Sequence, residues 1–296
     1  MRSPRLFRFA RVVVAGGCLL AVAGCEMATG SLAGHASDEW TRSYPLTPGG
    51  EVRIVNTSGR VEIEGADTGT VEVHAERIAR ATTELAAREL VSHITIREDV
   101  RPDRVAIETE RPAGILIGVS FEVRYRVRAP KTAVIRVQTT NGAVTLASLD
   151  GRVDARSTNG SVTGRDLSGG VEASTTNGGV TMELASVGAD GVRLKTVNGG
   201  IQLTLPEAAK ADLTATCTNG GIDVSGLQLD VQEQSRRRVG GRLNGGGAAV
   251  ELRTVNGGIR VRARSSETSN TTTGPQTARH VVAARVESLR RVVLVR

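Results

Sequence analysis

The sequence predicts an all-β fold, namely a β-solenoid or β-helix-like stack of short strands with one short helix near the N-terminal end. Three observations predict this class. Asn-Gly pairs recur through the second half of the chain at a regular spacing, the residues around each pair alternate between apolar and polar, and aromatic residues make up only 2% of the sequence. A fixed period of about twenty residues is typical of repeat architectures, and a core of small aliphatic side chains suits thin stacked layers.

Six Asn-Gly pairs define the repeats, and they follow one another after 18, 18, 21, 21 and 37 residues. Apolar or small residues stand six and four positions before each asparagine and apolar residues stand three positions after it, and residues of the same parity share one face of a strand. We therefore expect these columns to point inward. Each pair is expected to form a structural turn, because asparagine and glycine both tolerate positive φ. The turn residues are Asn141, Gly142, Asn159, Gly160, Asn177, Gly178, Asn198, Gly199, Asn219, Gly220, Asn256 and Gly257.

A second set of turns lies between the Asn-Gly pairs, at 150–151, 168–170, 190–191 and 207–210. Each repeat is therefore expected to contain two strands and two turns. Asn-Gly is also a strong signal for a two-residue hairpin, so an antiparallel meander is the alternative. The same turn recurs at every second connection, which favours a solenoid in which equivalent residues lie above one another. In a solenoid the asparagine side chains are expected to form a hydrogen-bonded ladder along one edge.

The segment before the repeats contains a degenerate copy at 51–64, in which Ser58-Gly59 replaces Asn-Gly. Further strands are expected at 71–74, 92–98, 104–109 and 119–128. The one helix is expected at 82–91, because this segment has a threonine at its start, an early glutamate, and Leu85 and Leu90 on an apolar side.

The gap of 37 residues between the last two anchors contains an excursion at 226–247 with three arginines at 236–238. We expect a basic surface loop there, and the alternative is a contact for a phosphorylated lipid or an acidic polymer. Residues 265–274 are a polar linker, and the tail at 275–296 is either a basic amphipathic helix at an anionic membrane surface or a disordered segment.

The N-terminal residues resemble a bacterial lipoprotein leader. Four arginines at positions 2, 5, 8 and 11 precede a short apolar run at 12–23, and the run ends in Val-Ala-Gly before Cys25. These features predict a lipoprotein signal peptide at 1–24 with lipidation of Cys25, and the alternative is an ordinary secretory signal. Residues 25–39 are expected to form a tether, and the repeat domain is expected at 40–264. Glu26 after the cysteine favours the outer membrane over the inner one.

Charge and residue types exclude several classes of function. The net charge of +7 comes from the leader and the tail, which leaves −1 for the residues between them, so a nucleic-acid partner is not expected. The four histidines are scattered, so no metal site and no cofactor are expected. Cys217 stands in a column of Thr and Ser residues, which indicates a structural role. No nucleophile motif is present, and the sequence therefore does not predict an enzyme.

The order of these segments resembles the bacterial β-strand-repeat family that carries the label "putative adhesin". The resemblance covers residues 40–263 and rests on four segments: Tyr-x-Val-x-x-Pro at 125–130, the six Asn-Gly repeats, the glycine-rich return at 240–247, and Thr-Val-Asn-Gly-Gly-Ile at 254–259. It implies a β-solenoid-like envelope protein with no catalytic residues.

Together these features predict a lipid-anchored, non-enzymatic protein of the cell envelope, either adhesin-like or a structural or binding scaffold. The expected partners are the membrane, through the N-terminal lipid, and an envelope glycan or protein. The alternatives are a polysaccharide-binding or polysaccharide-active β-helix protein and an accessory to envelope-stress signalling.

Overall fold

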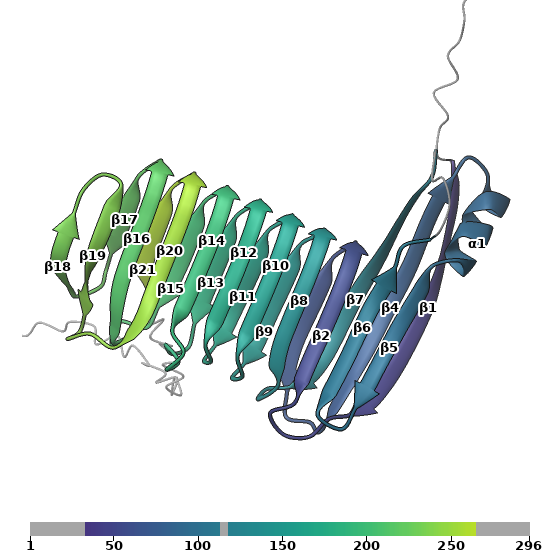
Figure 1. Ribbon diagram of the computed structural model, residues 1–296, viewed down its shortest axis with the longest axis horizontal. Helices are drawn as coiled ribbons and strands as arrows, with labels where there is room; N and C mark the ends of the chain where they lie inside the picture. Colours follow the sequence, from purple (N-terminus) through teal and green to yellow (C-terminus); the bar gives the residue numbers. More distant parts are fainter. Residues whose placement is uncertain (1–32, 113–117, 265–296) are drawn as a thin grey trace, which may run out of the picture.

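A computed structural model describes residues 33–112 and 118–264. Within these ranges the chain forms two large β-sheets and one short helix (Figure 1). The predicted fold class is therefore confirmed. The predicted signal peptide, the lipidation site Cys25, the linker and the tail lie outside the described residues.

The first sheet, here called sheet A, contains ten strands. Eight of its strands, from β7 to β17 in spatial order, run parallel to one another, whereas β4 pairs antiparallel with both β1 and β7. In spatial order the strands are β1 (Gly34–Pro45), β4 (Thr70–Ala81), β7 (Ser120–Pro130), β3 (Val61–Ala66), β9 (Val144–Leu149), β11 (Val162–Leu167), β13 (Val180–Leu184), β15 (Ile201–Leu205), β21 (Ile259–Ala263) and β17 (Ile222–Ser225).

The second sheet, sheet B, contains eleven strands and faces sheet A. Its central strands are parallel, and antiparallel strands stand at both ends. In spatial order the strands are β18 (Leu229–Gln234), β19 (Arg238–Leu243), β16 (Ala211–Asn219), β20 (Ala248–Asn256), β14 (Val192–Asn198), β12 (Val171–Asn177), β10 (Val153–Asn159), β8 (Val134–Asn141), β2 (Glu51–Ser58), β6 (Arg104–Glu110) and β5 (Thr95–Arg101).

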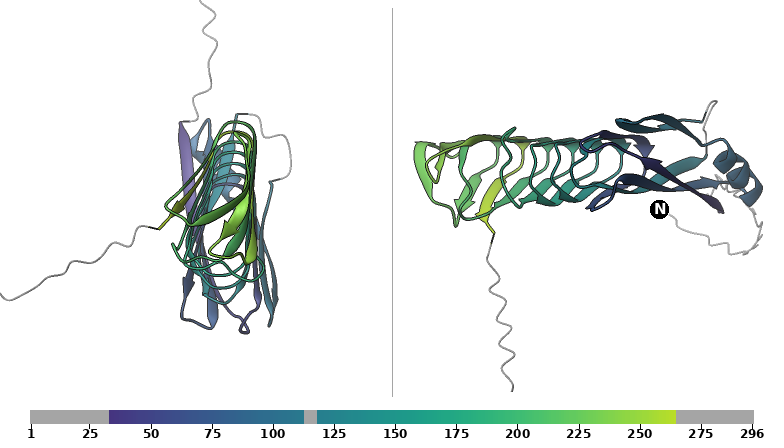
Figure 2. Two further views of the ribbon diagram at one scale, coloured as in Figure 1. Left: turned by 90° about the vertical axis from the view of Figure 1, so that its left-hand side faces the viewer. Right: turned by 90° about the horizontal axis from the view of Figure 1, so that it is seen from below.

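Each repeat contributes one strand to each sheet, and the two strands together are called a rung below. Equivalent residues of neighbouring rungs pair in register: Val153 lies beside Ile135 on one side and beside Val171 on the other. Parallel pairing at every step is incompatible with a meander, in which neighbouring strands are antiparallel. The predicted solenoid is therefore correct, and the antiparallel meander is excluded. Figure 2 shows the rungs from the end and from below as a row of narrow loops.

The apolar columns form one continuous core between the sheets. Val153, Val171 and Val192 belong to the same cluster, and each is at most 3% exposed. Apart from Tyr44 and Tyr125 near the N-terminal end, the core consists of aliphatic residues, Met182 and Cys217. The two layers can therefore lie close together along the repeats, as the low aromatic content predicts.

The rungs are not stacked in chain order. β20 pairs with β14 on one side and with β16 on the other, so Val250 lies between Val192 and Leu213. In sheet A, β21 lies between β15 and β17 in the same way. The last repeat of the sequence (β20 and β21) thus lies between the two repeats that precede it in the chain. The expectation that successive copies lie directly above one another is wrong at this step.

Residues 226–247 form a β-hairpin. The expectation of a basic surface loop in this excursion is therefore wrong. Its strand β19 pairs antiparallel with β16, and β18 pairs antiparallel with β19. The hairpin covers the outer edge of β16, whose backbone groups would otherwise lack partners on that side. Arg238 begins β19, and Arg236 lies at the hairpin turn. The same segment also gives the chain enough length to return to the open place beside β14.

The N-terminal end of the domain begins earlier than the sequence predicts. β1 starts at Gly34, within the expected tether, and pairs with β4 along all twelve of its residues. Asp38 of this strand accepts two hydrogen bonds from Arg77, at 2.7 and 2.6 Å. Because β1 is an edge strand with one exposed side, its small and polar residues resemble a linker in the sequence.

The helix α1 (Glu84–Ser92) is close to its predicted range. The Thr83 hydroxyl accepts a hydrogen bond from the backbone N–H of Ala86 and caps the helix. The buried face consists of Ala87, Leu90 and Val91, whereas Leu85 is 78% exposed. The prediction of Leu85 on the apolar side is therefore wrong, because at about 100° per residue Leu85 lies about 140° around the helix from Leu90. Of the described helical segments, none has the length and apolar character needed to cross a membrane.

Candidate functional site

The six Asn-Gly turns lie in one row along an edge of the solenoid, and their asparagine side chains form a continuous ladder. Each Nδ2 donates to the Oδ1 of the neighbouring asparagine, and all five hydrogen bonds are 2.8 Å long. In spatial order the ladder contains Asn141, Asn159, Asn177, Asn198, Asn256 and Asn219. The repeated asparagine therefore connects rungs.

The glycine after each asparagine is required by close packing between rungs. A Cβ atom on Gly178 would lie 2.3 Å from the carbonyl oxygen of Gly160, and one on Gly199 would lie 1.9 Å from that of Gly178. The six asparagines themselves do not adopt positive φ. The expected reason for asparagine at this turn is therefore wrong, because the residue serves the ladder and not an unusual backbone conformation.

At four of the six repeats, the Thr or Ser two positions before the asparagine also connects rungs. The Thr175 hydroxyl donates to the Gly160 carbonyl at 2.8 Å, and Ser157, Thr196 and Thr254 donate to equivalent carbonyls at 2.8 to 2.9 Å. Cys217 takes this place in the last rung, where it is 2% exposed and its Sγ lies 4.0 Å from the carbonyl oxygen of Arg236. The residues of the motif Thr-x-Asn-Gly thus form contacts between neighbouring rungs.

Several charged residues on the outer face of sheet B form ion pairs with one another. Arg193 contacts Glu251 at 3.1 Å and Glu172 at 3.9 Å. Arg156 contacts Asp154 at 2.9 Å and Glu172 at 3.6 Å. These acidic and basic residues of neighbouring strands therefore neutralise one another without a ligand.

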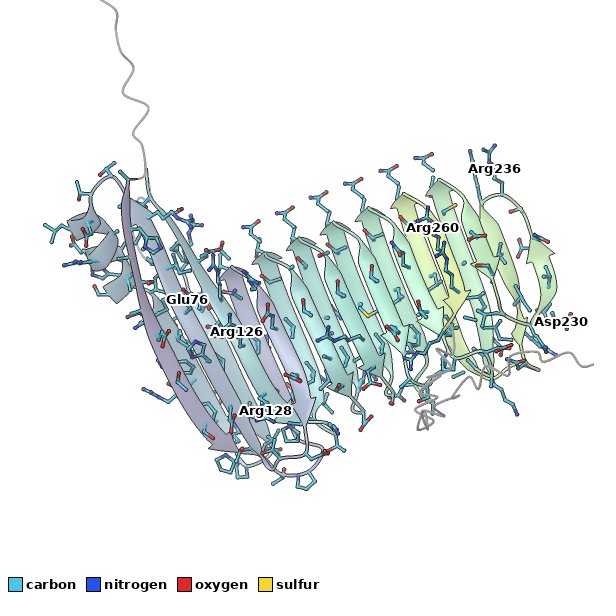
Figure 3. The ribbon with its side chains drawn as sticks, turned by 180° about the vertical axis from the view of Figure 1, so that it is seen from behind. Glu76, Arg126, Arg128, Asp230, Arg236 and Arg260 are labelled. Carbon is cyan, nitrogen blue, oxygen red and sulfur yellow. The ribbon has the colours of Figure 1, made fainter. Side chains whose placement is uncertain are left out.

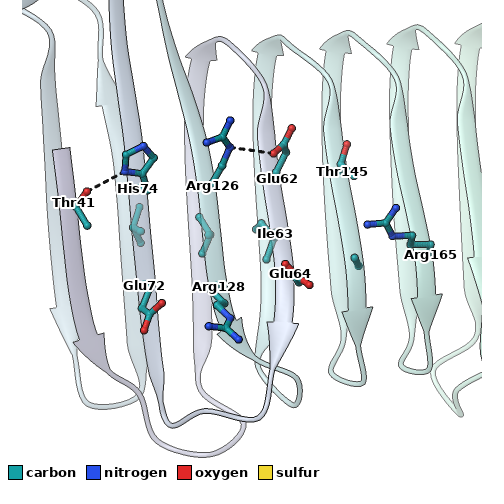
Figure 4. A pocket seen from close by; sticks show the side chains of 13 residues that line it. Thr41, Glu62, Ile63, Glu64, Glu72, His74, Arg126, Arg128, Thr145 and Arg165 are labelled. Carbon is teal, nitrogen blue, oxygen red and sulfur yellow. Dashed lines mark hydrogen bonds and ion pairs between the residues drawn. The ribbon is translucent and has the colours of Figure 1, made fainter. Parts of the chain in front are cut away.

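The outer face of sheet A has a groove of about 550 Å³ near the N-terminal end of the repeats (Figures 3 and 4). It crosses β1, β4, β7, β3, β9 and β11, which lie next to one another in the sheet. Its polar lining residues are Thr41, Glu72, His74, Arg126, Arg128, Glu62, Glu64, Thr145 and Arg165. The groove is the candidate functional site.

In one row of groove residues, the polar side chains pair with one another. The hydroxyl of Thr41 and Nδ1 of His74 share a hydrogen bond of 3.0 Å. Arg126 lies 3.6 Å from Glu62, and Figure 4 shows the two side chains directed toward each other across β7 and β3. This row forms one wall of the groove.

A second row, one step further along the strands, contains charges that are not paired. Glu72, Arg128 and Glu64 occupy neighbouring strands in that order, and all three are exposed. Ala147 follows on β9 and Arg165 on β11. Within 33–112 and 118–264, none of these four charged side chains has an ion-pair partner.

Ala147 forms the floor of the groove. It is 6% exposed and stands in an outward column, where its neighbours in the sheet are the long side chains of Glu64 and Arg165. Beyond Arg165, Glu183 contacts Arg264 at 3.0 Å, so it does not neutralise Arg165. Figure 4 shows Arg165 directed from β11 toward β9, over the space that the small Ala147 side chain leaves.

The groove is not visible in the sequence pattern. Its residues come from strands that lie far apart in the chain and become neighbours only through the order of sheet A. A signal was present in the outward column that contains Ala147, since an alanine there interrupts a row of long polar side chains. As for chemistry, no group of three metal-ligating side chains occurs in the described part of the chain. The groove offers charge and hydrogen bonds to a ligand.

The fold and the groove define the protein as an all-β repeat protein, a two-sheet solenoid with a charged groove on one outer face. The chain belongs to the Toastrack DUF4097 family, whose model matches residues 50–262. The resemblance seen in the sequence is thus confirmed.

Three solved structures are similar to the chain. A "putative cell adhesion protein" from Clostridium sporogenes has 10% identity and a TM-score of 0.44, and the alignment covers 77% of this chain and 100% of that one. A "putative adhesin" from Bacteroides fragilis has 11% identity and a TM-score of 0.34, with coverages of 77% and 97%. A "putative lipid binding protein" from Parabacteroides distasonis has 10% identity and a TM-score of 0.24, with coverages of 77% and 97%. No curated protein matches the chain.

Proposed function

We propose that the protein is a lipid-anchored, non-enzymatic protein of the cell envelope that binds an envelope component in the groove of sheet A. One observation carries this proposal: the residues of the repeat motif form contacts between rungs, whereas four charged side chains of the groove have no ion-pair partner within the described residues. A surface with unpaired charges around a small floor residue is suited to recognition of a charged ligand.

The absence of catalysis is part of the proposal. Hydrolysis by a pair of carboxylates requires one of them to be held protonated, which is commonly achieved by burial away from water. Glu64 and Glu72 are exposed, and Arg128 lies between them. Neither carboxylate is therefore buried in the way that this chemistry requires.

The polysaccharide alternative has less support than binding of a charged ligand. Sugar rings commonly stack on aromatic side chains, and no aromatic residue lines the groove. A turnover screen of the full chain against envelope polysaccharides separates the two functions. Reproducible turnover that is lost in Glu64→Gln would establish the enzyme.

Lipid anchoring is tested by membrane fractionation of the full chain expressed in a bacterium with lipoprotein processing. Cys25→Ala is expected to release the protein from the membrane fraction, because the thiol that carries the lipid is missing. Cys18→Ala is the control, since Cys18 lies within the predicted leader, and it is expected to leave the fractionation unchanged. Retention of Cys25→Ala on membranes would contradict the anchor.

Binding is tested by sedimentation of the detergent-purified full chain with isolated cell envelopes. The double variant Arg128→Ala/Arg165→Ala is expected to lose binding. The control is Lys195→Ala/Arg253→Ala, which removes two exposed cations from sheet B. Equal loss in both double variants would show a nonspecific charge effect, and unchanged binding in both would contradict a role of the groove.

A further inference from the structure

We infer that the groove recognises a short zwitterionic peptide, with its ammonium group at Glu64 and its carboxylate at Arg165. This inference rests on the proposed binding function and specifies the chemistry of the ligand. It is carried by three features of the second row: two opposite charges without partners, their separation, and the small residue between them.

The separation of the Glu64 and Arg165 backbones is similar to the length of a peptide of two or three residues. Glu64 and Arg165 are both aligned with Ala147 on the strand between them, so they are two strand positions apart. Neighbouring strands lie about 4.8 Å apart, which places the two Cα atoms about 10 Å apart. An extended peptide spans about 7 Å with two residues and about 10 Å with three.

The small side chain of Ala147 lowers the outer face between Glu64 and Arg165, and Arg165 is directed over it at the edge of the groove. Equivalent outward positions on adjacent strands carry glutamate and arginine, whose side chains would fill the space above β9. On sheet B, Arg193 and Glu251 lie on neighbouring strands and contact each other at 3.1 Å. Across Ala147 the two charges are one strand too far apart for such a contact, and a ligand with opposite charges at its ends can connect them.

The remaining charges of the groove favour a zwitterion over a polyanion. Three glutamates and three arginines line the groove, together with His74. A polyanion would meet the glutamates at every second strand and be repelled, whereas a zwitterion places each of its charges beside an opposite one. Arg128 and Glu72 extend the same alternation toward β4 and can hold a further polar group of a longer peptide.

The inference is tested by calorimetric titration of the detergent-purified full chain with trialanine. The matched ligands are N-acetyl-trialanine, which lacks the ammonium group, and trialanine amide, which lacks the carboxylate. Trialanine is expected to bind, and each capped ligand is expected to bind about tenfold more weakly, since each loses one charge-assisted contact. Equal binding of all three ligands would overturn the inference.

Variants assign the two charges to their residues. Glu64→Gln is expected to weaken binding of trialanine about tenfold but to leave binding of the N-acetyl ligand unchanged, and Arg165→Gln is expected to do the same for the amide. Ala147→Leu fills the floor and is expected to abolish binding of all three ligands, whereas Arg253→Gln on sheet B is the control. Circular dichroism of each variant verifies that it is folded.

The outcomes separate this inference from the proposed function. If cell envelopes bind through the groove but trialanine does not bind at millimolar concentration, the ligand is not a zwitterionic peptide and the binding function stands. If neither envelopes nor trialanine bind, both fail. Binding of trialanine that is insensitive to Glu64→Gln and Arg165→Gln would place the peptide outside the groove and overturn the inference.

Discussion

The side-chain amide of Asn256 donates a hydrogen bond of 2.8 Å to the side-chain oxygen of Asn198, although 58 residues separate them in the chain. The next asparagine of the ladder, Asn219, donates to Asn256 at the same distance. Asn256 therefore takes part in two ladder bonds and Asn219 in one, which is the reverse of what stacking in chain order would give.

This order predicts unequal effects of two substitutions. Asn256→Ala removes two hydrogen bonds and is expected to lower the free energy of unfolding by about 1–2 kcal/mol, whereas Asn219→Ala removes one and is expected to cost about half as much. Both side chains are exposed, so differences in burial do not obscure the comparison. Urea denaturation measures both values. A larger loss for Asn219→Ala would contradict the rung order.

Two adjacent glycines in one turn are expected to differ sharply in their tolerance of alanine. At Gly178 a Cβ would lie 2.3 Å from the carbonyl oxygen of Gly160, whereas at Gly179 the nearest atom would lie at an ordinary distance of 3.4 Å. Gly178→Ala is expected to cost about 3 kcal/mol, because neighbouring rungs must move apart. Gly179→Ala is expected to change stability by less than about 1 kcal/mol. Thermal unfolding checks both, and a comparable loss in the two variants would contradict the packing argument.

The threonine column contains one exception that gives a further prediction. Thr139 is 2% exposed and its hydroxyl has no hydrogen-bond partner. In the equivalent place Thr175 donates to a glycine carbonyl, but the glycine carbonyl available to Thr139, that of Gly59, already accepts from Asn56 at 3.1 Å. Removal of an unpaired buried hydroxyl is favourable, whereas removal of a paired one leaves a carbonyl without a donor.

Valine at these two positions is therefore expected to have opposite effects. Thr139→Val is expected to raise the free energy of unfolding by about 1 kcal/mol, and Thr175→Val is expected to lower it by about 1–2 kcal/mol. The chemical change is identical in both variants, so each is the control for the other. Urea denaturation is again the measurement. Destabilisation of similar size at both positions would show that the Thr139 hydroxyl has a partner in solution.

The alternation of residues was sufficient to predict the rungs but not their order. Every repeat has the same inward columns, so Val250 fits beside Val192 as well as beside Leu213, and the pattern itself does not distinguish the possible neighbours. The spacing of 37 residues showed that the last repeat is separated from the others. It did not show that the intervening segment would form a hairpin, because Gly240 and Gly241 of β19 provide no side chains for a strand pattern.

The groove could not be predicted for a different reason. Glu64 and Arg165 belong to repeats that are far apart in the chain, and they become near neighbours only because β3 pairs with β9 and β9 with β11. The contribution of β4 and β7 depends on antiparallel pairing outside the repeats. Sequence periodicity identifies the outward residues of each strand, but the order of strands determines which of them meet.

Tyr125 gives a prediction about pH. It is buried in β7, where its hydroxyl shares a hydrogen bond of 2.7 Å with Thr109 of sheet B. Burial raises the pKa of Tyr125 from 10.0 to about 12, and the bond to Thr109 and the charge of Arg77 lower it by less. The folded protein therefore holds this proton more tightly than the unfolded chain does. Its contribution to stability is fully present below pH 10 and is lost as the pH rises to 12.

A difference of two pKa units corresponds to about 2–3 kcal/mol. The free energy of unfolding of the unaltered protein, measured relative to Tyr125→Phe, is expected to fall by that amount between pH 10 and pH 12. The comparison cancels the titration of lysines and of Tyr44, whose pKa burial and the neighbouring Glu98 also raise. Urea denaturation at half-unit steps of pH measures the difference. A constant difference across this interval would show that the Tyr125 hydroxyl is exposed to water in the folded protein.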